Sequence, residues 1–223
     1  MKITFITNTM IVIEGKNSKI LCDPWITFNN KSISGFYNFP KCNYTKEKVA
    51  QISPDYIYIT HTHPDHYDPP TLELFSKNVP ILVADYEVNF TEKVIKNIGF
   101  NDVRVIPKTI GMKLNVDDWV WAEPAQNNPE VDSLAVFKVD GKKIINANDN
   151  VFHREQCEKM TSKVNGVDIG LIPSAAHGPF PMFFENFNDK EKKSLAEERA
   201  IKLKETFVNY IKALRPEYVI PIA

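Results

Sequence analysis

Four side chains that bind metal ions in proteins fall within one six-residue stretch: His61, His63, Asp65 and His66. They directly follow residues 55–60, DYIYIT, whose β-branched and aromatic side chains are typical of a strand. In extended backbone, residues two apart point the same way, so His61 and His63 can bind one ion. The turn at Pro64 then directs Asp65 and His66 toward a second ion. Imidazole and carboxylate ligands favour Zn, Fe or Mn over Ca or Mg.

The alternative is a polar turn that holds these residues by chance. Three of the five histidines of the chain lie in this one stretch, which makes chance a weak explanation. We therefore expect one or two bound metal ions, with Zn as the first choice and Fe or Mn as alternatives.

The N-terminal half of the chain predicts the strands and helices that carry this stretch. The expected elements are three strands within 1–26, a strand over 79–85, short helices over 46–52 and after Pro70, and a helix that ends at Gly99. Residues 27–45 show no periodicity and predict a loop long enough to be a lid over a site.

The C-terminal half predicts a second run of strands and one long helix. WVWAE, SLAVFKVDGKKIINAN and VDIGLIP are rich in strand formers, and the middle segment contains a hairpin turn at Asp140-Gly141. Apolar residues recur with a helical period over 189–214, Pro216 stops this helix, and EYVIPIA is a last strand. Helices between two runs of strands predict an α/β (α+β) fold in which two sheets form the core and helices lie outside.

Composition excludes several classes of protein. The 223 residues include 27 Lys and Arg against 28 Asp and Glu, so nothing in the net charge of −1 favours nucleic acid or an anionic membrane as a partner. Three cysteines without a Cys-x-x-Cys pair argue against a disulfide framework and predict a cytoplasmic protein. No apolar run approaches the ~18 residues of a membrane helix, and the N-terminus is interpreted as a strand and not as a signal peptide.

The motifs resemble those of the metallo-β-lactamase-fold hydrolases. THTHPDH, over 60–66, is similar to the His-x-His-x-Asp-His motif of that superfamily, and ILCDPW, over 20–25, is similar to the strand that precedes its active-site loop. IINANDN, over 144–150, resembles the stretch whose aspartate bridges two metals. The resemblance implies a four-layer αββα sandwich and assigns the bridging role to Asp149. The alternative for Asp149 is a turn residue or a helix N-cap.

A closer resemblance is to the metallo-β-lactamase-like region of the CMP-N-acetylneuraminate hydroxylase family. NPEVDSLAVFKVDGKKIINAND, FPMFF and RPEYVIPIA resemble segments of that region and occur in the same order. Those enzymes also carry a Rieske iron–sulfur module, which needs two Cys and two His in paired motifs. This chain has no such pairs, so it cannot perform that oxygenation alone.

The chain departs from the superfamily pattern at two positions. Many members place a histidine where Gln126 or Asn127 stands here, which makes these two residues candidates for substrate binding, and another histidine where Ala223 stands. His177 lies in a loop that the resemblance places beside the site, so it is either a replacement metal ligand or a surface residue. His153 is either a substrate contact or ligand, or the first turn of a helix.

Other residues are candidates for supporting roles. Asp23 ends a strand before Pro24 and is either a partner that orients the histidine loop by hydrogen bonds or part of an Asp-Pro turn. Four aromatic residues either line the mouth of a substrate site or belong to the core: Trp25, Phe36, Trp119 and Trp121. The core is favoured for the last two. Three lysines in or beside the long loop either contact a phosphate of the substrate or lie in solvent, and solvent is favoured: Lys31, Lys41 and Lys46.

Three functions compete. The first is a metal-dependent hydrolase in which one ion provides hydroxide at neutral pH, the ion on Asp65 and His66 orients the leaving group, and Asp149 bridges the ions. Its substrate is a small phosphoester, lactone or amide, and phosphate or sugar-nucleotide groups fit the resemblance. The second is the substrate-binding part of an iron-dependent, sialate-like oxygenase. The third is a metal-binding protein without turnover.

The sequence stops within an apolar strand at Ala223. We therefore expect a single metallo-β-lactamase-like domain over 1–223 that is a truncated form of a longer protein or is completed by a partner. Such a domain would bind metal but hydrolyse model phosphodiesters and lactones slowly. An apolar edge near the C-terminus would favour a homo-oligomer.

Overall fold

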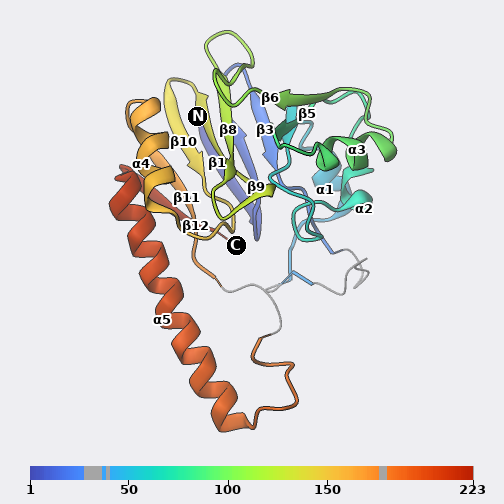
Figure 1. The fold of residues 1–223 in the computed structure, drawn as a ribbon. Coiled ribbons are helices and arrows are strands. Elements are labelled where there is room, and N and C mark those ends of the chain that lie inside the picture. The colour runs from blue at the N-terminus through green and yellow to red at the C-terminus, as the bar shows by residue number, and fades with distance from the viewer. Residues whose placement is uncertain (28–36, 39–40, 176–179, 223) are drawn as a thin grey trace.

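Two sheets form the centre of the computed structural model, which describes residues 1–27, 37–38, 41–175 and 180–222 (Figure 1). In the described residues the first sheet has six strands in the order β1-β2-β3-β4-β5-β6. Their bounds are β1 Lys2–Thr7, β2 Met10–Glu14, β3 Lys19–Cys22, β4 Tyr56–Tyr58, β5 Ile81–Ala84 and β6 Val103–Ile106. The pairs β1–β2 and β2–β3 are antiparallel, and β3 through β6 run parallel.

The second sheet contains the later strands, again six among the described residues, in the order β12-β11-β10-β9-β8-β7. Their bounds are β7 Met112–Lys113, β8 Trp119–Ala125, β9 Asn128–Val139, β10 Lys142–Asn146, β11 Ile169–Pro173 and β12 Tyr218–Ile222. The predicted turn between β9 and β10 is confirmed, since Asp140 and Gly141 both have positive φ, as a two-residue hairpin turn requires. Strands β10, β11 and β12 are parallel.

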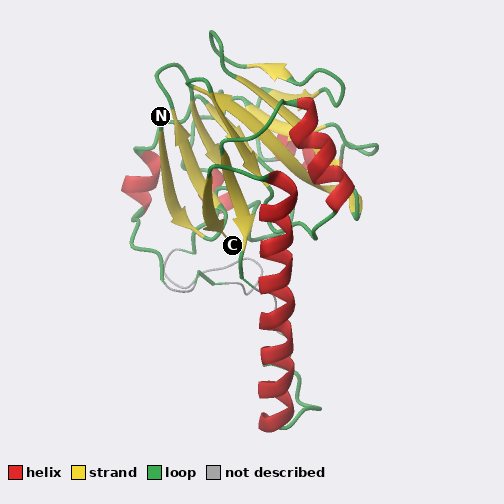
Figure 2. Ribbon diagram, turned by 90° about the vertical axis from the view of Figure 1, so that its left-hand side faces the viewer, coloured by secondary structure: helices red, strands yellow, loops and turns green. Residues whose placement is uncertain are grey.

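Helices cover the outer face of each sheet. Helices α1 (Lys46–Ala50), α2 (Pro69–Leu72) and α3 (Phe90–Asn97) bury Val49, Leu72 and Ile95 against the first sheet. Helices α4 (Arg154–Lys163) and α5 (Asp189–Leu214) bury Met160 and Tyr210 against the second. The inner faces of both sheets share a third apolar cluster that includes Tyr58 and Phe137. The predicted four-layer αββα sandwich is therefore confirmed (Figures 1 and 2).

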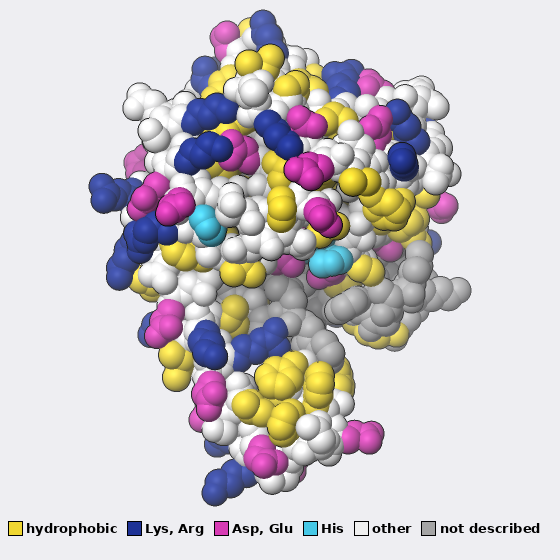
Figure 3. Space-filling view, in the orientation of Figure 1, with side chains coloured by type: hydrophobic (Ala, Val, Ile, Leu, Met, Phe, Trp, Pro, Cys, Tyr) yellow, Lys and Arg dark blue, Asp and Glu magenta, His cyan; other side chains and the backbone are white. Residues whose placement is uncertain are grey.

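Helix α5 continues well beyond the sandwich as an arm, as Figure 2 shows. A capping box at Asn188 and Glu191 fixes its first turn, and Arg215 in the left-handed conformation ends it. Its 26 residues span about 39 Å. The side chains of α5 that are buried, Tyr210, Ala213 and Leu214, all lie in its last turns. Hydrophobic side chains gather near the free end of the arm (Figure 3).

The strand ends that matter for chemistry meet at one edge of the sandwich. The backbone N–H of Asp23, just after β3, donates to Tyr58 O of β4 at 2.9 Å, so the ends of these strands lie side by side. Ser133 of β9 ties the second sheet to the same place, since its hydroxyl lies 2.8 Å from the Tyr58 hydroxyl and donates to Thr60 O at 2.8 Å. Residues that follow β3, β4 and β10 are thereby brought together.

Candidate metal centre

His61 and His63 point ring nitrogens at the same position. Nε2 of His61 lies 2.8 Å from Nδ1 of His63, and the two ring centroids are 4.4 Å apart. Two ligand atoms of one tetrahedral zinc ion are about 3.3 Å apart, because each Zn–N bond is about 2.0–2.1 Å long. His61 is fully buried and His63 is not, so one ring comes from the interior and the other from the rim. The expectation that both face one ion agrees with this geometry.

Asp149 lies near both His61 and His66. Its Oδ1 lies 4.0 Å from Nε2 of His61, and its Oδ2 lies 3.6 Å from Nε2 of His66. Asp65 approaches the same nitrogen of His66, with Oδ2 at 3.8 Å. His61, His66 and Asp149 each offer one ligand atom within 4.8 Å of the others. The carboxylate of Asp149 thus has one oxygen within 4.0 Å of a ring nitrogen of each of these two histidines.

The backbone after β10 places Asp149 there. Asn148 adopts a left-handed conformation with φ of 54°, which turns the chain at the strand end. The amide of Asn150 donates to Ser133 O at 2.9 Å and to Ala147 O at 3.0 Å, so the turn is held on both sides. Asparagine tolerates positive φ better than most residues, which suits the Asn-Asp-Asn sequence to this turn.

Asp23 orients His66 from behind. The fully buried carboxylate accepts hydrogen bonds from the Thr60 backbone N–H and hydroxyl, both at 2.8 Å, and lies 3.0 Å from Nδ1 of His66. A proton held on Nδ1 leaves Nε2 free to bind a metal. This is the geometry expected of the supporting role that the sequence suggests for Asp23.

The electrostatics of this group follow from burial and charge. Burial alone lowers the pKa of His66, but the carboxylates of Asp23 and Asp149 outweigh it, so the pKa stands well above its usual value. Burial raises the pKa of Asp23 against the opposing effect of His66. A proton or a metal cation is therefore favoured at Nε2 of His66.

Asp132 is a neighbour of the site that the sequence analysis does not single out. Its Oδ1 lies 3.4 Å from Nδ1 of His61 and accepts a hydrogen bond from the Asn148 amide at 3.0 Å. Burial, together with the negative charge of Asp149, raises the pKa of Asp132 to about 7. Asp132 shares the surroundings of this nitrogen with two other groups, since Nδ1 of His61 also lies 3.1 Å from the Thr60 hydroxyl and 3.3 Å from the Asn148 amide nitrogen. The family resemblance of the segment that begins NPEVDS drew attention to this stretch of the chain. Only the structure shows that its Asp132 is buried beside His61.

The donor set fits a bound transition metal. Nε2 of His66 is buried and has no hydrogen-bond partner, although two carboxylate oxygens lie 3.6 and 3.8 Å away. An orphaned buried nitrogen is costly unless a ligand satisfies it. Imidazole nitrogens together with carboxylate oxygens suit zinc, iron or manganese.

Other predicted site residues lie at the periphery. Gln126 and Asn127 are exposed at the β8–β9 turn, where the Gln126 N–H donates to the Gln156 side chain at 2.8 Å and the Asn127 amide donates to Val151 O at 3.3 Å. His153 is the N-cap of α4, and its Nδ1 accepts the N–H of Gln156 at 3.3 Å. His153 thus lies at the start of a helix, close to the first-turn position that one of its two interpretations expected, and its side chain caps that helix.

Some predictions fall on residues that the structure does not describe. His177, Lys31 and Phe36 lie outside the described ranges, as does most of the loop predicted as a lid. Two described residues of that loop are hydrogen-bonded to each other: the backbone N–H and the hydroxyl of Thr27 donate to Oδ1 of Asn38, at 2.7 and 2.9 Å. Of the loop lysines, Lys41 is exposed and Lys46 begins α1.

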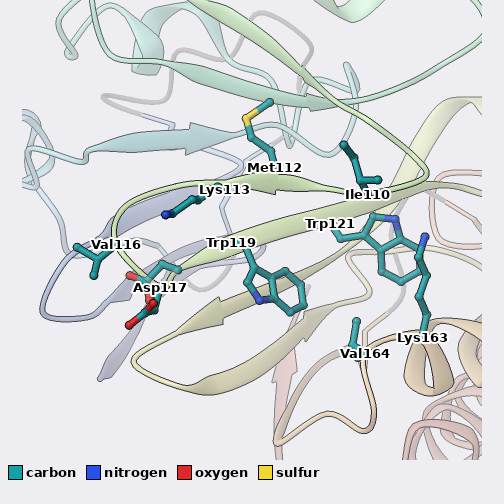
Figure 4. Close-up of a pocket in the computed structure, with 10 residues that line it drawn as sticks. Ile110, Met112, Lys113, Val116, Asp117, Trp119, Trp121, Lys163 and Val164 are labelled. Atoms are coloured by element: carbon teal, nitrogen blue, oxygen red, sulfur yellow. The ribbon is translucent and has the colours of Figure 1, made fainter.

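The tryptophans of β8 line a cavity of their own. Trp121 is buried and Trp119 partly so, and both pack against the cluster beneath α4. They also border a cavity of about 580 Å³ together with Lys113 and Lys163, as Figure 4 shows. The Lys163 ammonium lies 3.8 Å from the Trp121 ring centroid. None of the described metal-binding candidates lines this cavity, so it is separate from the metal centre. The packing of both tryptophans beneath α4 makes them chiefly core residues, as expected. Trp25 is also buried.

An αββα sandwich with histidines and aspartates at one strand-end edge defines the class of metallo-β-lactamase-fold proteins. Comparison with protein families agrees, because residues 2–173 match the model of the beta-lactamase superfamily domain. The chain belongs to this superfamily. None of the helices in the described part of the chain combines the length and apolar character needed to cross a bilayer.

Individual relatives differ in their described activities. A UPF0173 metal-dependent hydrolase from Ligilactobacillus salivarius is 26% identical, with 78% of this chain and 72% of the relative aligned. The cytidine monophosphate-N-acetylneuraminic acid hydroxylase of Danio rerio is 24% identical, with 99% of this chain and 37% of the relative aligned. The chain spans less than half the length of several curated relatives that it matches.

Solved structures show the same fold. An isothiocyanate hydrolase from Delia radicum gut bacteria superposes with a TM-score of 0.66 over 100% of this chain and 84% of that chain, at 20% sequence identity. At this identity the likeness establishes the architecture, which agrees with the two sheets described above.

Proposed function

We propose that this chain is a metal-dependent hydrolase that cleaves a small phosphoester, lactone or amide. The observation that carries the proposal is the position of Asp149, whose two oxygens lie 4.0 Å from Nε2 of His61 and 3.6 Å from Nε2 of His66. A carboxylate between two histidine groups suits a pair of ions, and two-metal sites are typical of hydrolytic enzymes. The metal-dependent hydrolase among the relatives supports this choice.

The ligands divide into two sets. His61, His63 and one oxygen of Asp149 would hold the first ion. Asp65, His66 and the other oxygen of Asp149 would hold the second. We infer zinc for both, because imidazole and carboxylate ligands suit it and it needs no redox partner. When bound, such an ion lowers the pKa of a coordinated water to about 7 and polarises the bond to be cleaved.

The residues of the chain prepare and maintain the site. Asp23 would hold the proton of His66 on Nδ1, and the Thr60 hydroxyl, the Asn148 amide and the Asp132 carboxylate surround Nδ1 of His61 at 3.1, 3.3 and 3.4 Å. Both carboxylates are themselves fixed by hydrogen bonds, to Thr60 and Asn148 respectively. The two rings therefore keep their Nε2 atoms directed at Asp149 without reorganisation.

Hydrolysis of a substrate panel tests the proposal. The zinc-loaded protein would be assayed with bis(p-nitrophenyl) phosphate, an acyl homoserine lactone and a p-nitroanilide. We expect slow hydrolysis of at least one substrate, lost on chelation and lost in Asp149→Ala. The matched control is Asp118→Asn, a buried carboxylate of the β7–β8 turn, which should retain the rate. Equal rates in the wild type and Asp149→Ala would contradict the proposal.

A second candidate is the substrate-binding part of an iron-dependent oxygenase. It is favoured by the hydroxylase relative, which aligns with 99% of this chain. The same donor set can hold iron. Metal analysis of protein purified without added metal separates the two, because zinc supports hydrolysis and iron supports oxygenation. Oxygen consumption with an added electron donor and the iron-loaded protein would favour the second candidate.

A further inference from the structure

A groove lies between the arm and the chain segment that precedes it. It has a volume of about 570 Å³, and its walls are the start of the 180–187 segment, residues Ser174 and Ala175, and one face of α5. The apolar side chains that line it include Phe180, Met182, Leu203 and Phe207. A cavity of this size accommodates a small organic molecule.

The groove begins at the edge that carries the metal centre. In the parallel pairing of β10 with β11, Asn146 lies opposite Leu171. Because the two strands are parallel, Asp149 and Ser174 both follow the carboxyl ends of neighbouring strands at the same edge of the sheet, and Ser174 lines the groove. The Ser174 N–H donates to Ile222 O of β12 at 2.9 Å, so this end of the groove is fixed to the sheet. A ligand that lies along the groove therefore has one end at the strand edge of Asp149.

The charge of the groove is one-sided. Arg199 and Lys204 line it, and no acidic residue does so among the described residues. The Arg199 guanidinium donates to the Phe180 carbonyl, which joins the helix to the opposite wall. The Lys204 side chain makes no hydrogen bond or ion pair with another described residue. Figure 3 shows Lys or Arg side chains next to the hydrophobic ones on the arm. Guanidinium and ammonium groups beside apolar walls suit an organic anion.

We propose that this groove binds the non-reacting part of the substrate, and that this part is an organic anion with an aromatic or other apolar body. The proposal rests on the proposed function, since it assigns the groove to the substrate of the metal centre. Phe180, Met182, Leu203 and Phe207 contact the apolar body, and Lys204 and Arg199 select the negative charge. Binding energy from such a remote group positions the scissile bond at the metal centre.

A pair of fluorescent probes tests the charge and the location. 8-Anilino-1-naphthalenesulfonate is an anion that cannot be hydrolysed at a phosphoester, lactone or amide bond, and N-phenyl-1-naphthylamine is its neutral counterpart. The variants are Lys204→Glu, and Lys202→Glu as the matched control, because Lys202 is exposed on the same helix and does not line the groove. Circular dichroism verifies that both variants fold.

We expect the wild type to bind the anionic probe with one-to-one stoichiometry, and Lys204→Glu to weaken this binding at least tenfold. Lys202→Glu should change it less than twofold, and neither variant should alter binding of the neutral probe more than twofold. The anionic probe should also inhibit hydrolysis competitively. Equal weakening by both variants, or absence of saturable binding, would overturn the groove as an anion site. Saturable binding without inhibition of hydrolysis would overturn its assignment to the substrate.

The design separates this proposal from the proposed function. Probe binding is measured on both the zinc-loaded and the chelator-treated protein, so it does not depend on turnover. If the zinc-loaded wild type hydrolyses none of the substrates but binds the anionic probe in a way that depends on Lys204, the result counts against the hydrolase alone. Normal hydrolysis without probe binding would count against the groove alone.

Discussion

Replacement of Asp23 by Asn probes how the chain prepares its metal ligands. The substitution keeps the size of the side chain and removes its charge. Oδ1 of Asp23 accepts the Thr60 N–H, while Oδ2 faces both the Thr60 hydroxyl and Nδ1 of His66. In the variant, the amide oxygen can keep the backbone bond at Oδ1. The NH₂ group then stands at the Oδ2 position, where it is a donor and no longer an acceptor.

The magnitude follows from these contacts. Two hydrogen bonds to a charged acceptor are lost, each worth about 1.5–3 kcal/mol. The imidazole recovers part of this by releasing its Nδ1 proton and keeping a proton on Nε2, so that Nδ1 accepts from the new amide. We therefore expect the free energy of unfolding of the metal-free protein to fall by about 1–3 kcal/mol. The proton now occupies the atom that binds the metal, and loss of such a supporting group typically weakens metal affinity by about 10–100-fold.

Two assays measure the two effects. Urea denaturation of the chelator-treated protein gives the stability change, and competition with a chromophoric chelator gives the zinc affinity. Asp118→Asn is the control, because Asp118 is also buried and accepts the Asp140 N–H at 3.1 Å outside the metal centre. It should lose stability without losing zinc affinity. If Asp23→Asn binds zinc as tightly as the wild type, the idea that Asp23 sets the His66 tautomer is wrong.

Three further predictions concern the neighbours of the site and the backbone. Asp132→Asn should weaken zinc binding up to about tenfold, because its carboxylate lies behind His61; an unchanged chelator competition curve would refute this. Zinc affinity should fall as the pH drops through the raised pKa of His66, since a proton then occupies Nε2; titrations across that range should show proton release on binding, and a pH-independent affinity would be the contrary result. Gly111→Ala should reduce urea stability more than Gly99→Ala, because both have positive φ but only a Cβ at Gly111 would meet a backbone oxygen of β8, at 2.6 Å; equal losses would show that the close contact is relieved.

Local sequence predicted most of the fold. The three N-terminal strands, the hairpin at Asp140-Gly141 and the helix over 189–214 were expected and are present, because alternation, turn residues and helical periodicity are local signals. The extension of α5 beyond the sandwich was not predictable in this way. Its apolar positions begin at Leu195 and recur to the end of the helix, although only the last turns are buried against the second sheet.

The candidate site was predicted less evenly. The His61–His66 motif places its own ligands, since they follow one strand within six residues. The approach of Asp149 depends on contacts between sheets, and only the motif resemblance suggested it. Asp132 was missed for the same reason, because its contact with His61 joins residues that are distant in sequence. Gln126 and Asn127 were predicted to bind substrate because many superfamily members have a histidine there, and the register of β8 with β9 leaves both exposed at the turn.

Metal content is the most direct test of the central claim that these residues form a metal centre. The wild type and the His61→Ala/His63→Ala double variant would be purified without added metal, dialysed against zinc and analysed by mass spectrometry for bound ions per chain. We predict one to two zinc ions in the wild type and loss of at least one in the double variant, with circular dichroism unchanged. A folded double variant that keeps the full wild-type complement of zinc would contradict the account.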